Sequence, residues 1–570
     1  MQPVITSEQI RLIDRLTTER YGILSLTLME NAAAAMARVI NTELDGTSAE
    51  KRILVLCGKG NNGGDGAAAA RLLATAGARV DVVLLAQVAD AKGDARTNFD
   101  RLRLWIDEQT FREGRAGPAS ETGALNLFEC DSEPAWNHLL ESILSNSYDV
   151  VIDALFGTGL TRPVEGIHRE AIKYLHHLRQ ARDLDANSFC RIVSVDLPSG
   201  LNSDSTELIG DAVYADITVT MTAPKAANVL PPAANCNGRL FVADIGSPDE
   251  LIGQSESQLF IAESDDAHRW LIKTRYTPDS YKNVHGHALV IAGSRGFTGA
   301  AALCGNAAMV AGAGLVTVAT PASVQSSVAT QVMPELMTTA LAETDRGAVS
   351  DDALDYVSHL AERVNVIAIG PGLSSEDERT RSFVRGVVNR RRTPIIIDAD
   401  GLNCLAPWPR DLQGSSDYPI ILTPHPGEML RLLGTTDKST LNDRVVAARG
   451  FATLHRVILV LKGSRSLIAA PDGRVFVNLT GNAGLGTAGA GDTLTGIITG
   501  FLAQSYGTLG DRAAALEAVL AALYIGGLAG DLAARELGMR TMVASDIRRH
   551  LSAAIRLLDP WGEAPPVSNF

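Results

Sequence analysis

A glycine-rich stretch early in the chain has the residue types of an anion-binding loop. Residues 58–66 read GKGNNGGDG and follow the apolar run 53–57, and a helix-like sequence begins at Ala67. Glycine allows close backbone approach and leaves amide N–H groups free to donate, and the positive end of a following helix adds to this. The stretch therefore predicts a phosphate cradle. It lacks the GK[ST] ending of a P-loop, and a glycine-rich loop alone is weak evidence, so a glycine-rich turn without a ligand stays an alternative.

Two further apolar runs end in carboxylates. Asp153 stands in "VVIDALFGTGL", and Asp196 stands in "IVSVDLPSGLNSD", where Ser199 follows. If these runs are strands of one open sheet, their carboxyl ends form the edge at which such sheets bind ligands. Oxygen-bearing side chains suit a hard cation, and there are no His or Cys ligands to suggest zinc or iron. A single carboxylate at a strand end can instead be a helix cap or a loop anchor.

A second glycine motif lies in the last quarter of the chain. Residues 484–500 read GLGTAGAGDTLTGIITG, so Gly489, Ala490, Gly491 and Asp492 precede a helix-like run of small residues. Free amides at a helix start can stabilise the charge that develops when a phosphoryl group moves, and Asp492 can accept a proton from a hydroxyl. The alternative is a tight turn for helix packing.

Two motifs upstream of this turn carry further polar residues. "VLKGSRSLI" follows an apolar run and offers Lys462, Gly463 and Ser464 to nucleotide phosphates. "LTPHPGEML" places His425 and Glu428 past another apolar run, between prolines that restrict the loop. A lone histidine in such a loop is more often structural, so this motif depends on its neighbours for a functional interpretation.

The elements that must position these residues are alternating strands and helices. Short β-branched runs, separated by Ala- and Leu-rich stretches, occur at 52–58, 79–86, 149–157, 191–200, 216–223, 239–246, 287–296, 314–321, 365–372, 394–400, 419–428 and 457–464. The last of them precedes a hairpin-like pair, "SLIAAP" and "RVFVNL". Near-continuous apolar strands separated by helices predict parallel sheets covered on both faces. A polar stretch divides the pattern, which predicts domains at 1–246 and 281–570 with a linker region at 247–280.

Bulk composition restricts the classes of partner and compartment. The 570 residues exceed one core, and two large α/β domains fit this length. A net charge of −14 argues against nucleic acid or an anionic membrane as the main partner. The six cysteines are scattered and form no disulfide framework. With no signal-peptide pattern and no run of 18 apolar residues, we expect a cytoplasmic protein without membrane spans.

The three motifs of the first half, in their order, resemble the epimerase domain of bifunctional NAD(P)H-hydrate repair enzymes, and "LMENAA" (28–33) fits that family's first helix. The resemblance implies a Rossmann-like three-layer αβα sandwich. It implies that the substrate is contacted by Asn61, Asn62, Gly63, Gly64, Asp65, Gly157, Thr158, Gly159, Leu160, Thr161, Arg162 and Pro163. It also implies K⁺ ligation by Asn62, Asp153 and Ser199, with Asp196 as a substrate-binding acid/base. Lys59 is a mild departure, because a small residue or proline is expected there.

The motifs of the second half, with "IGPGLS" (369–374) and "IIDADGLN" (396–403), resemble the ADP-dependent NAD(P)H-hydrate dehydratase, a ribokinase-like α/β domain. The resemblance implies that Gly372, His425 and Asp492 contact the hydrated nicotinamide nucleotide, with Asp492 catalytic. The residues implied to contact ADP are Lys462, Gly463, Ser464, Arg465, Ser466 and Gly491. Gly-Ala-Gly-Asp replaces the family's common Gly-Thr-Gly-Asp, and backbone amides should tolerate this.

Together the two resemblances cover nearly the whole chain and imply metabolite repair. The first domain would interconvert the R and S forms of hydrated NADH and NADPH, and the second would dehydrate the S form at the expense of ADP, with Mg²⁺ on the phosphates. In this reaction phosphate is transferred to the C6 hydroxyl and then expelled. We also expect a homo-oligomer.

Two rival functions stay open at this level. One is a ribokinase-like vitamin kinase with a nucleotide-binding regulatory half, and the other is a first half that is a binding module without catalysis. An ordinary NAD dehydrogenase is disfavoured, because no GxGxxG with a downstream ribose-binding acid occurs. The preference for NADHX or NADPHX, and for ADP or ATP, is not set by these motifs.

Overall fold

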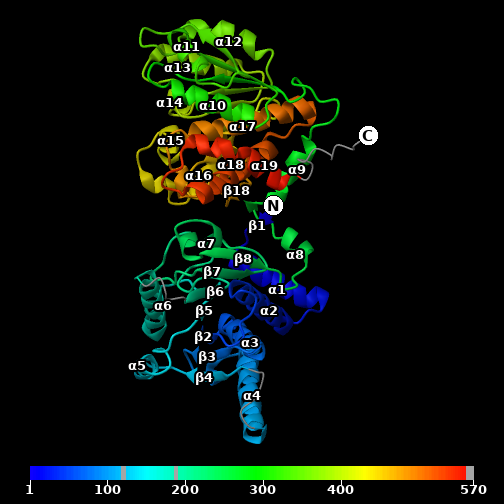
Figure 1. The fold of residues 1–570 in the computed structure, drawn as a ribbon, viewed down its shortest axis with the longest axis vertical. Helices are drawn as coiled ribbons and strands as arrows, with labels where there is room; N and C mark the ends of the chain where they lie inside the picture. Colours follow the sequence, from blue (N-terminus) through cyan, green and yellow to red (C-terminus); the bar gives the residue numbers. More distant parts are fainter. Residues whose placement is uncertain (117–122, 185–189, 560–570) are drawn as a thin grey trace. The chain divides into compact units, whose positions relative to one another are not determined.

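The protein is described from a computed structural model that covers residues 1–116, 123–184 and 190–559 (Figure 1). Its contacts divide the chain into two compact units, one of Pro3–Ser257 and one that begins at Gln258 and includes Met1–Gln2. The division falls inside the stretch 247–280, which carries α8 (Asp249–Gly253), β9 (Leu259–Ala262) and α9 (Ser264–Lys273). Both units are α/β, so the predicted fold class of two α/β domains is confirmed.

The N-terminal unit is built on a sheet of seven parallel strands. Their spatial order is β4 (Leu125–Glu129), β3 (Arg79–Leu84), β2 (Arg52–Cys57), β5 (Val150–Ala154), β6 (Arg191–Val195), β7 (Ile217–Met221) and β8 (Arg239–Ala243). Six of these strands were predicted. The sequence pattern missed β4, because this edge strand is only partly buried and lacks a continuous apolar run.

Helices cover both faces of this sheet (Figure 1). Along β2, Ile53 and Val55 pack in one core, whereas Leu54 and Leu56 pack in another. The first core contains α2 (Ser25–Glu43), α3 (Asn61–Thr75) and α4 (Gly93–Ala116), and the second contains α5 (Glu133–Glu141) and α6 (Gly166–Leu184). The arrangement is the three-layer sandwich that continuous apolar strands predict. The unit also contains α1 (Ser7–Tyr21), α7 (Ala226–Val229) and the short α8.

The expected start of the helix after the glycine-rich stretch is wrong by six residues. Helix α3 begins at Asn61, not at Ala67. Its glycines give close packing, since a Cβ on Gly64 would lie 2.7 Å from the Ala95 Cα and one on Gly66 2.5 Å from the Ala154 Cβ. Asn61 and Asn62 are therefore the first two residues of a helix, whose free N–H groups can donate to an anion.

The C-terminal unit has an eleven-stranded mixed sheet. Its strands follow the order β1 (Gln2–Pro3), β9, β18 (Val475–Asn478), β17 (Leu467–Ala469), β16 (Ile458–Leu461), β15 (Ile420–Leu422), β14 (Ile395–Ile397), β13 (Val366–Ile369), β10 (His287–Ile291), β11 (Leu315–Pro321) and β12 (Met337–Leu341). From β12 to β16 all neighbours are parallel, whereas β17 pairs antiparallel with both β16 and β18. The predicted hairpin is thus confirmed.

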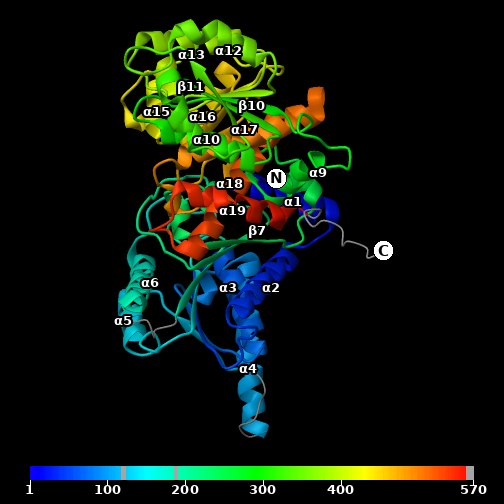
Figure 2. The same ribbon diagram turned by 45° about the horizontal axis from the view of Figure 1, so that its top comes forward.

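One large core of this unit is formed by helices rich in small residues (Figure 2). It contains α9, α10 (Thr298–Val310), α17 (Ala490–Leu509), α18 (Ala515–Leu537) and α19 (Ala544–Leu558). The other helices are α11 (Gln325–Ala329), α12 (Leu354–Ala361), α13 (Glu378–Arg390), α14 (Asp400–Leu405), α15 (Pro426–Leu432) and α16 (Arg444–His455). By length and composition α18 could cross a membrane, and the bent pair α1–α2 passes the same test together. Because 67% of the apolar window of α18 is buried in the domain, we interpret it as a core helix.

Candidate functional sites

The first candidate site lies where the strand order of the N-terminal sheet reverses. Strand β2 lies between β3 and β5, so the loops after β2 and β5 leave in opposite directions and open a crevice for ligands. A Cβ on Gly157 would lie 3.1 Å from the Asn62 Oδ1 and 3.5 Å from an Asp196 carboxylate oxygen. Asn62, Gly157 and Asp196, which were predicted from separate motifs, therefore lie close together. Only glycine at position 157 leaves space between the Asn62 and Asp196 side chains.

Asp153 is the centre of a buried hydrogen-bond network beside this crevice. Its carboxylate is fully buried and accepts from the Ser194 Oγ at 2.8 Å, the Ser199 N at 2.8 Å and the Ser199 Oγ at 2.5 Å. Burial raises the pKa of Asp153, although the hydrogen bonds from Ser199 oppose the rise. The Ser199 Oγ also accepts from the Phe156 N at 2.9 Å, which connects the loops after β5 and β6.

The oxygen-bearing side chains at this crevice are of the kinds that can hold a monovalent cation. Asn62 offers an amide oxygen, Asp153 a carboxylate and Ser199 a hydroxyl, which are ligands that hard cations prefer. Asn62 is 8% exposed, and its buried Nδ2 has no hydrogen-bond partner within the described part of the chain. Among the described residues no three His, Cys, Asp or Glu side chains gather where they could hold a metal ion. A single carboxylate suits a cation of low charge.

A buried lysine that sequence reasoning missed pairs with Asp196. Lys225 is 1% exposed, and its Nζ donates to the Asp196 Oδ1 at 2.5 Å, to the Thr220 Oγ1 at 2.9 Å and to the Met221 carbonyl at 3.0 Å. The Asp196 backbone has a φ of 63°, a strained conformation for a residue other than glycine, and such strain concentrates at functional sites. The only signal in the sequence was a lysine two residues after the predicted strand at 216–223.

Two more carboxylates, those of Asp65 and Asp14, lie near the Asp196–Lys225 pair. Burial raises the pKa of Asp65 well above its usual range, and the charges of Asp196 and Asp14 add to the rise. Burial raises the pKa of Asp14 to about 6, with Lys225 opposing and Asp196 reinforcing the shift. The Asp14 Oδ1 is buried without a hydrogen-bond partner in the described part of the chain. Carboxylates with unequal proton affinities can supply both an acid and a base. Asp14 lies on α1, which no sequence motif had marked.

Asn61 and the segment 158–163 lie at the rim of this site, whereas Gly63 and Gly64 are buried in α3. Asn61 is exposed, and the segment 158–163 is a largely exposed loop between β5 and α6. The Thr158 carbonyl accepts from the Ser203 Oγ at 3.4 Å, which connects this loop to the one after β6. The loop borders the crevice without entering the buried network.

The second candidate site lies at the carboxyl ends of β14, β15 and β16. Asp398, 1% exposed, accepts from the Lys462 Nζ at 2.7 Å and from the Thr495 Oγ1 of α17 at 2.7 Å. A Cβ on Gly491 would lie 3.4 Å from the Lys462 Nζ. Burial disfavours the Lys462 ammonium, but Asp398 and Glu428 outweigh burial and raise its pKa. Lys462 is therefore a fixed positive charge at the start of α17.

Asp492 lies in the first turn of α17, in the same group. Burial raises its pKa to about 6; the charges of Asp398 and Asp400 add to the rise, and Lys462 opposes it. The preceding Gly489 has a φ of 82°, and a Cβ there would lie 2.5 Å from the Leu303 side chain. The turn thus requires glycine, and α17 begins directly after it with amide N–H groups that have no partner within the helix.

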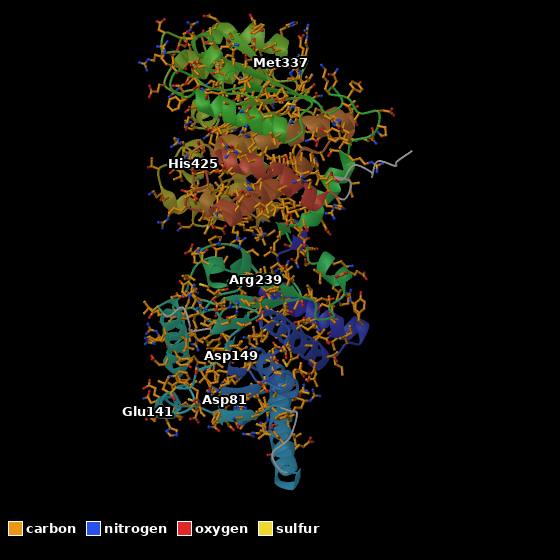
Figure 3. All side chains as sticks on the ribbon, in the orientation of Figure 1. Asp81, Glu141, Asp149, Arg239, Met337 and His425 are labelled. Carbon is orange, nitrogen blue, oxygen red and sulfur yellow. The ribbon has the colours of Figure 1, made fainter. Side chains whose placement is uncertain are left out.

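His425 and Glu428 fix the loop after β15. The His425 Nδ1 accepts from the Gly427 N at 3.0 Å, and a Glu428 carboxylate oxygen accepts from the His425 N at 2.8 Å, so the pair caps α15. Because Nδ1 accepts, the proton of a neutral His425 is on Nε2. The ring is 52% exposed, and its Nε2 lies 3.6 Å from a Glu428 carboxylate oxygen. His425 lies at the surface of the C-terminal unit (Figure 3). Gly372 has a φ of 63° and packs against Ala300 and Phe297.

The predicted nucleotide loop is held by an arginine outside it. Arg444 donates to the Ser464 carbonyl at 2.8 Å and to the Arg465 carbonyl at 3.5 Å. The Arg465 side chain turns to the Leu479 carbonyl at 2.6 Å, and the Ser466 Oγ donates to the Gly463 carbonyl at 3.2 Å. Lys462, Gly491 and Asp492 therefore lie close together. The segment 463–466 follows Lys462 as a loop that hydrogen bonds hold in place.

Comparisons with known proteins identify the family of this chain. Residues 25–227 match the family model described as YjeF-related protein N-terminus, and residues 288–553 match the NAD(P)H-hydrate dehydratase model. The chain is similar to the bifunctional NAD(P)H-hydrate repair enzyme of Moorella thermoacetica, with 40% identity over 98% of this chain and 97% of that one. It is 31% identical to that of Escherichia coli, over 97% of this chain and 93% of that one.

A solved structure similar to the C-terminal unit is the ADP/ATP-dependent NAD(P)H-hydrate dehydratase of Bacillus subtilis, co-crystallised with ATP and Mg²⁺. It is 30% identical, covers 53% of this chain and 99% of its own, and has a TM-score of 0.45. The two family models and the full-length relatives show that this chain belongs to the bifunctional NAD(P)H-hydrate repair enzymes, with an epimerase and a dehydratase domain.

Proposed function

We propose that each activity of this family is carried out at one of the two sites described above. The observation that carries the proposal for the dehydratase is the position of Asp492, a carboxylate with a pKa of about 6 beside the Lys462–Asp398 pair and the amides of a helix start. A group with that pKa is ionised at neutral pH and still basic enough to accept a hydroxyl proton.

In the dehydratase site, Asp492 accepts the proton of the C6 hydroxyl of the S hydrate. The amides of Gly489, Ala490 and Gly491 and the Lys462 ammonium stabilise the β-phosphoryl group of ADP as it moves to that oxygen and AMP leaves. Phosphate is a better leaving group than hydroxide. The lone pair of the ring nitrogen then expels it, and loss of the C5 proton restores the double bond. Gly372 and His425 hold the nicotinamide end, and the segment 462–466 holds the nucleotide. Mg²⁺ would neutralise charge on the phosphates.

In the epimerase site, Asp196 moves the proton that opens and recloses the C6 centre. Lys225 donates a hydrogen bond to Asp196 and holds its carboxylate in place, and Asp65, with its raised pKa, supplies the neighbouring acid. The amides of Asn61 and Asn62 and the loop 157–163 bind the dinucleotide. Asn62, Asp153 and Ser199 would hold K⁺, which supplies a fixed positive charge next to the bound nucleotide. We further propose a cytoplasmic homo-oligomer, which sedimentation of the purified protein would test.

A kinase that releases a stable phosphorylated alcohol would use the same geometry around Asp492, so the product decides between the two functions. A mixture of R and S NADHX is incubated with the enzyme, ADP, Mg²⁺ and K⁺. We expect full conversion to NADH, because the first site replenishes the S form. Conversion of the S fraction alone would refute the epimerase assignment. A stable phosphorylated product without NADH would refute the dehydratase assignment.

A further inference from the structure

The C-terminal unit has an open pocket of about 890 Å³ that no part of the mechanism above uses. It is lined by residues of α13, α14 and α15, among them Arg381, Asn403 and Arg431, and by Ser375 and Thr435 of the connecting loops. The lining residues carry two positive charges and no carboxylate. In a chain with a net charge of −14, such a surface favours an anionic ligand.

In each arginine of the pocket, only the Nε of the guanidinium group donates a hydrogen bond within the described part of the chain. The Arg381 Nε donates to the Ser375 carbonyl at 2.7 Å, and the Arg431 Nε donates to the Asn403 Oδ1 at 2.9 Å. Neither side chain forms an ion pair with a described residue, and their terminal nitrogens have no acceptor in the described part of the chain. Fixed guanidinium groups with free donor pairs are suited to bidentate contact with phosphate.

Short contacts connect the pocket to the dehydratase site. Asp400 accepts from the Ser374 N at 2.9 Å and from the Asn403 Nδ2 at 3.3 Å. The negative charge of Asp400 also raises the pKa of Asp492. On the other side, a Cβ on Gly427 would lie 2.8 Å from the His425 ring and 3.9 Å from an Arg431 nitrogen. The pocket therefore begins next to His425, and its lining includes no residue of the nucleotide loop 462–466.

The substrate must extend out of the reaction centre on one side. Its hydrated ring lies at Asp492 under the proposed function, and ADP occupies the side of Lys462. The ring is only one end of a dinucleotide, whose diphosphate and adenosine need a separate path. We propose that Arg381 and Arg431, which we call the arginine pocket, bind a phosphate group of the hydrated dinucleotide. This inference rests on the proposed function.

The test compares Arg381→Gln, Arg431→Gln and the double variant with the full-length enzyme. Arg385→Gln is the matched control, because Arg385 is exposed on the same helix, pairs with Glu378 at 3.3 Å and does not line the pocket. The KM for (S)-NADHX should rise about tenfold or more for each arginine removed, since a hydrogen bond to a charged group is worth about a factor of ten or more in affinity. The KM for ADP and the thermal unfolding temperature should stay at wild-type values.

Two substrates locate the phosphate. Equal losses with NADHX and NADPHX would support contact with the diphosphate, and a loss confined to NADPHX would support contact with its extra phosphate. Arg381→Lys and Arg431→Lys keep the charge without the paired donors, so their KM values should lie between those of the wild type and the Gln variants. A double Gln variant whose KM for both substrates stays within twofold of the wild type overturns the inference alone. A wild type that dehydrates neither substrate overturns the proposed function as well.

Discussion

Replacement of Asp492 by asparagine is the sharpest perturbation of the dehydratase site. The amide keeps the size of the side chain but cannot accept the hydroxyl proton. It leaves the Lys462–Asp398 pair, at 2.7 Å, and the amides of α17 in place. Loss of a positioned general base lowers a rate by about 10²–10⁴-fold. At about 1.4 kcal/mol per factor of ten, the activation barrier should rise by about 3–5 kcal/mol.

The assay follows the return of NADH absorbance from (S)-NADHX with ADP and Mg²⁺ at saturating concentrations. The internal control is R/S interconversion by the same preparation, because Asp196 and Lys225 lie in the other unit. We expect epimerisation at the wild-type rate and dehydration reduced at least a hundredfold. A variant that dehydrates within tenfold of the wild type would refute the assigned role.

The pH dependence of the wild type tests the same reasoning without a substitution. With a pKa of about 6, Asp492 loses its ability to accept a proton as the pH falls through that value. The rate of dehydration should be about half-maximal near pH 6 and about one tenth of the maximum near pH 5. A rate that stays level from pH 8 down to pH 5 would contradict it.

Three further perturbations test other parts of the structure. Asp398→Asn removes a negative charge that raises the pKa of Asp492 and frees the charge of Lys462, so the acidic limb of the dehydration profile should move to lower pH; a shift to higher pH would contradict the electrostatic argument. Lys225→Met leaves the partly buried Asp196 without its partner, so epimerisation should be lost and the free energy of unfolding of the N-terminal unit should fall by about 1–3 kcal/mol. Adding Asp196→Asn should recover stability, measured by urea denaturation, without recovering epimerisation, and a single variant that still epimerises would exclude the role of Lys225. Gly66→Ala places a methyl group 2.5 Å from the Ala154 Cβ and should destabilise the N-terminal unit by about 1–3 kcal/mol, whereas Gly60→Ala meets nothing within 4 Å and should unfold like the wild type; equal urea midpoints for both variants would show that α3 can move away from the sheet.

Local sequence determined most of the architecture of this protein. Buried parallel strands leave continuous apolar runs, so all but short or edge strands such as β4 were visible. The residues that end these strands, among them Asp153, Asp196, His425 and Lys462, were visible for the same reason, since carboxyl ends of parallel strands share one edge of a sheet. The sequence did not show where α3 begins. Glycine normally disfavours a helix, but in α3 it permits close packing against Ala95 and Ala154.

The partners that give those residues their chemistry were decided only by the tertiary structure. Lys225 lies 29 positions after Asp196, Asp398 lies 64 positions before Lys462, and Asp14 approaches the epimerase site from a helix near the N-terminus. No local pattern encodes these contacts, because burial and charge–charge distance arise from strands and helices that meet after folding. Proton affinity depends on both, so a sequence can name a carboxylate as a candidate acid or base, but the fold sets the pH at which it acts.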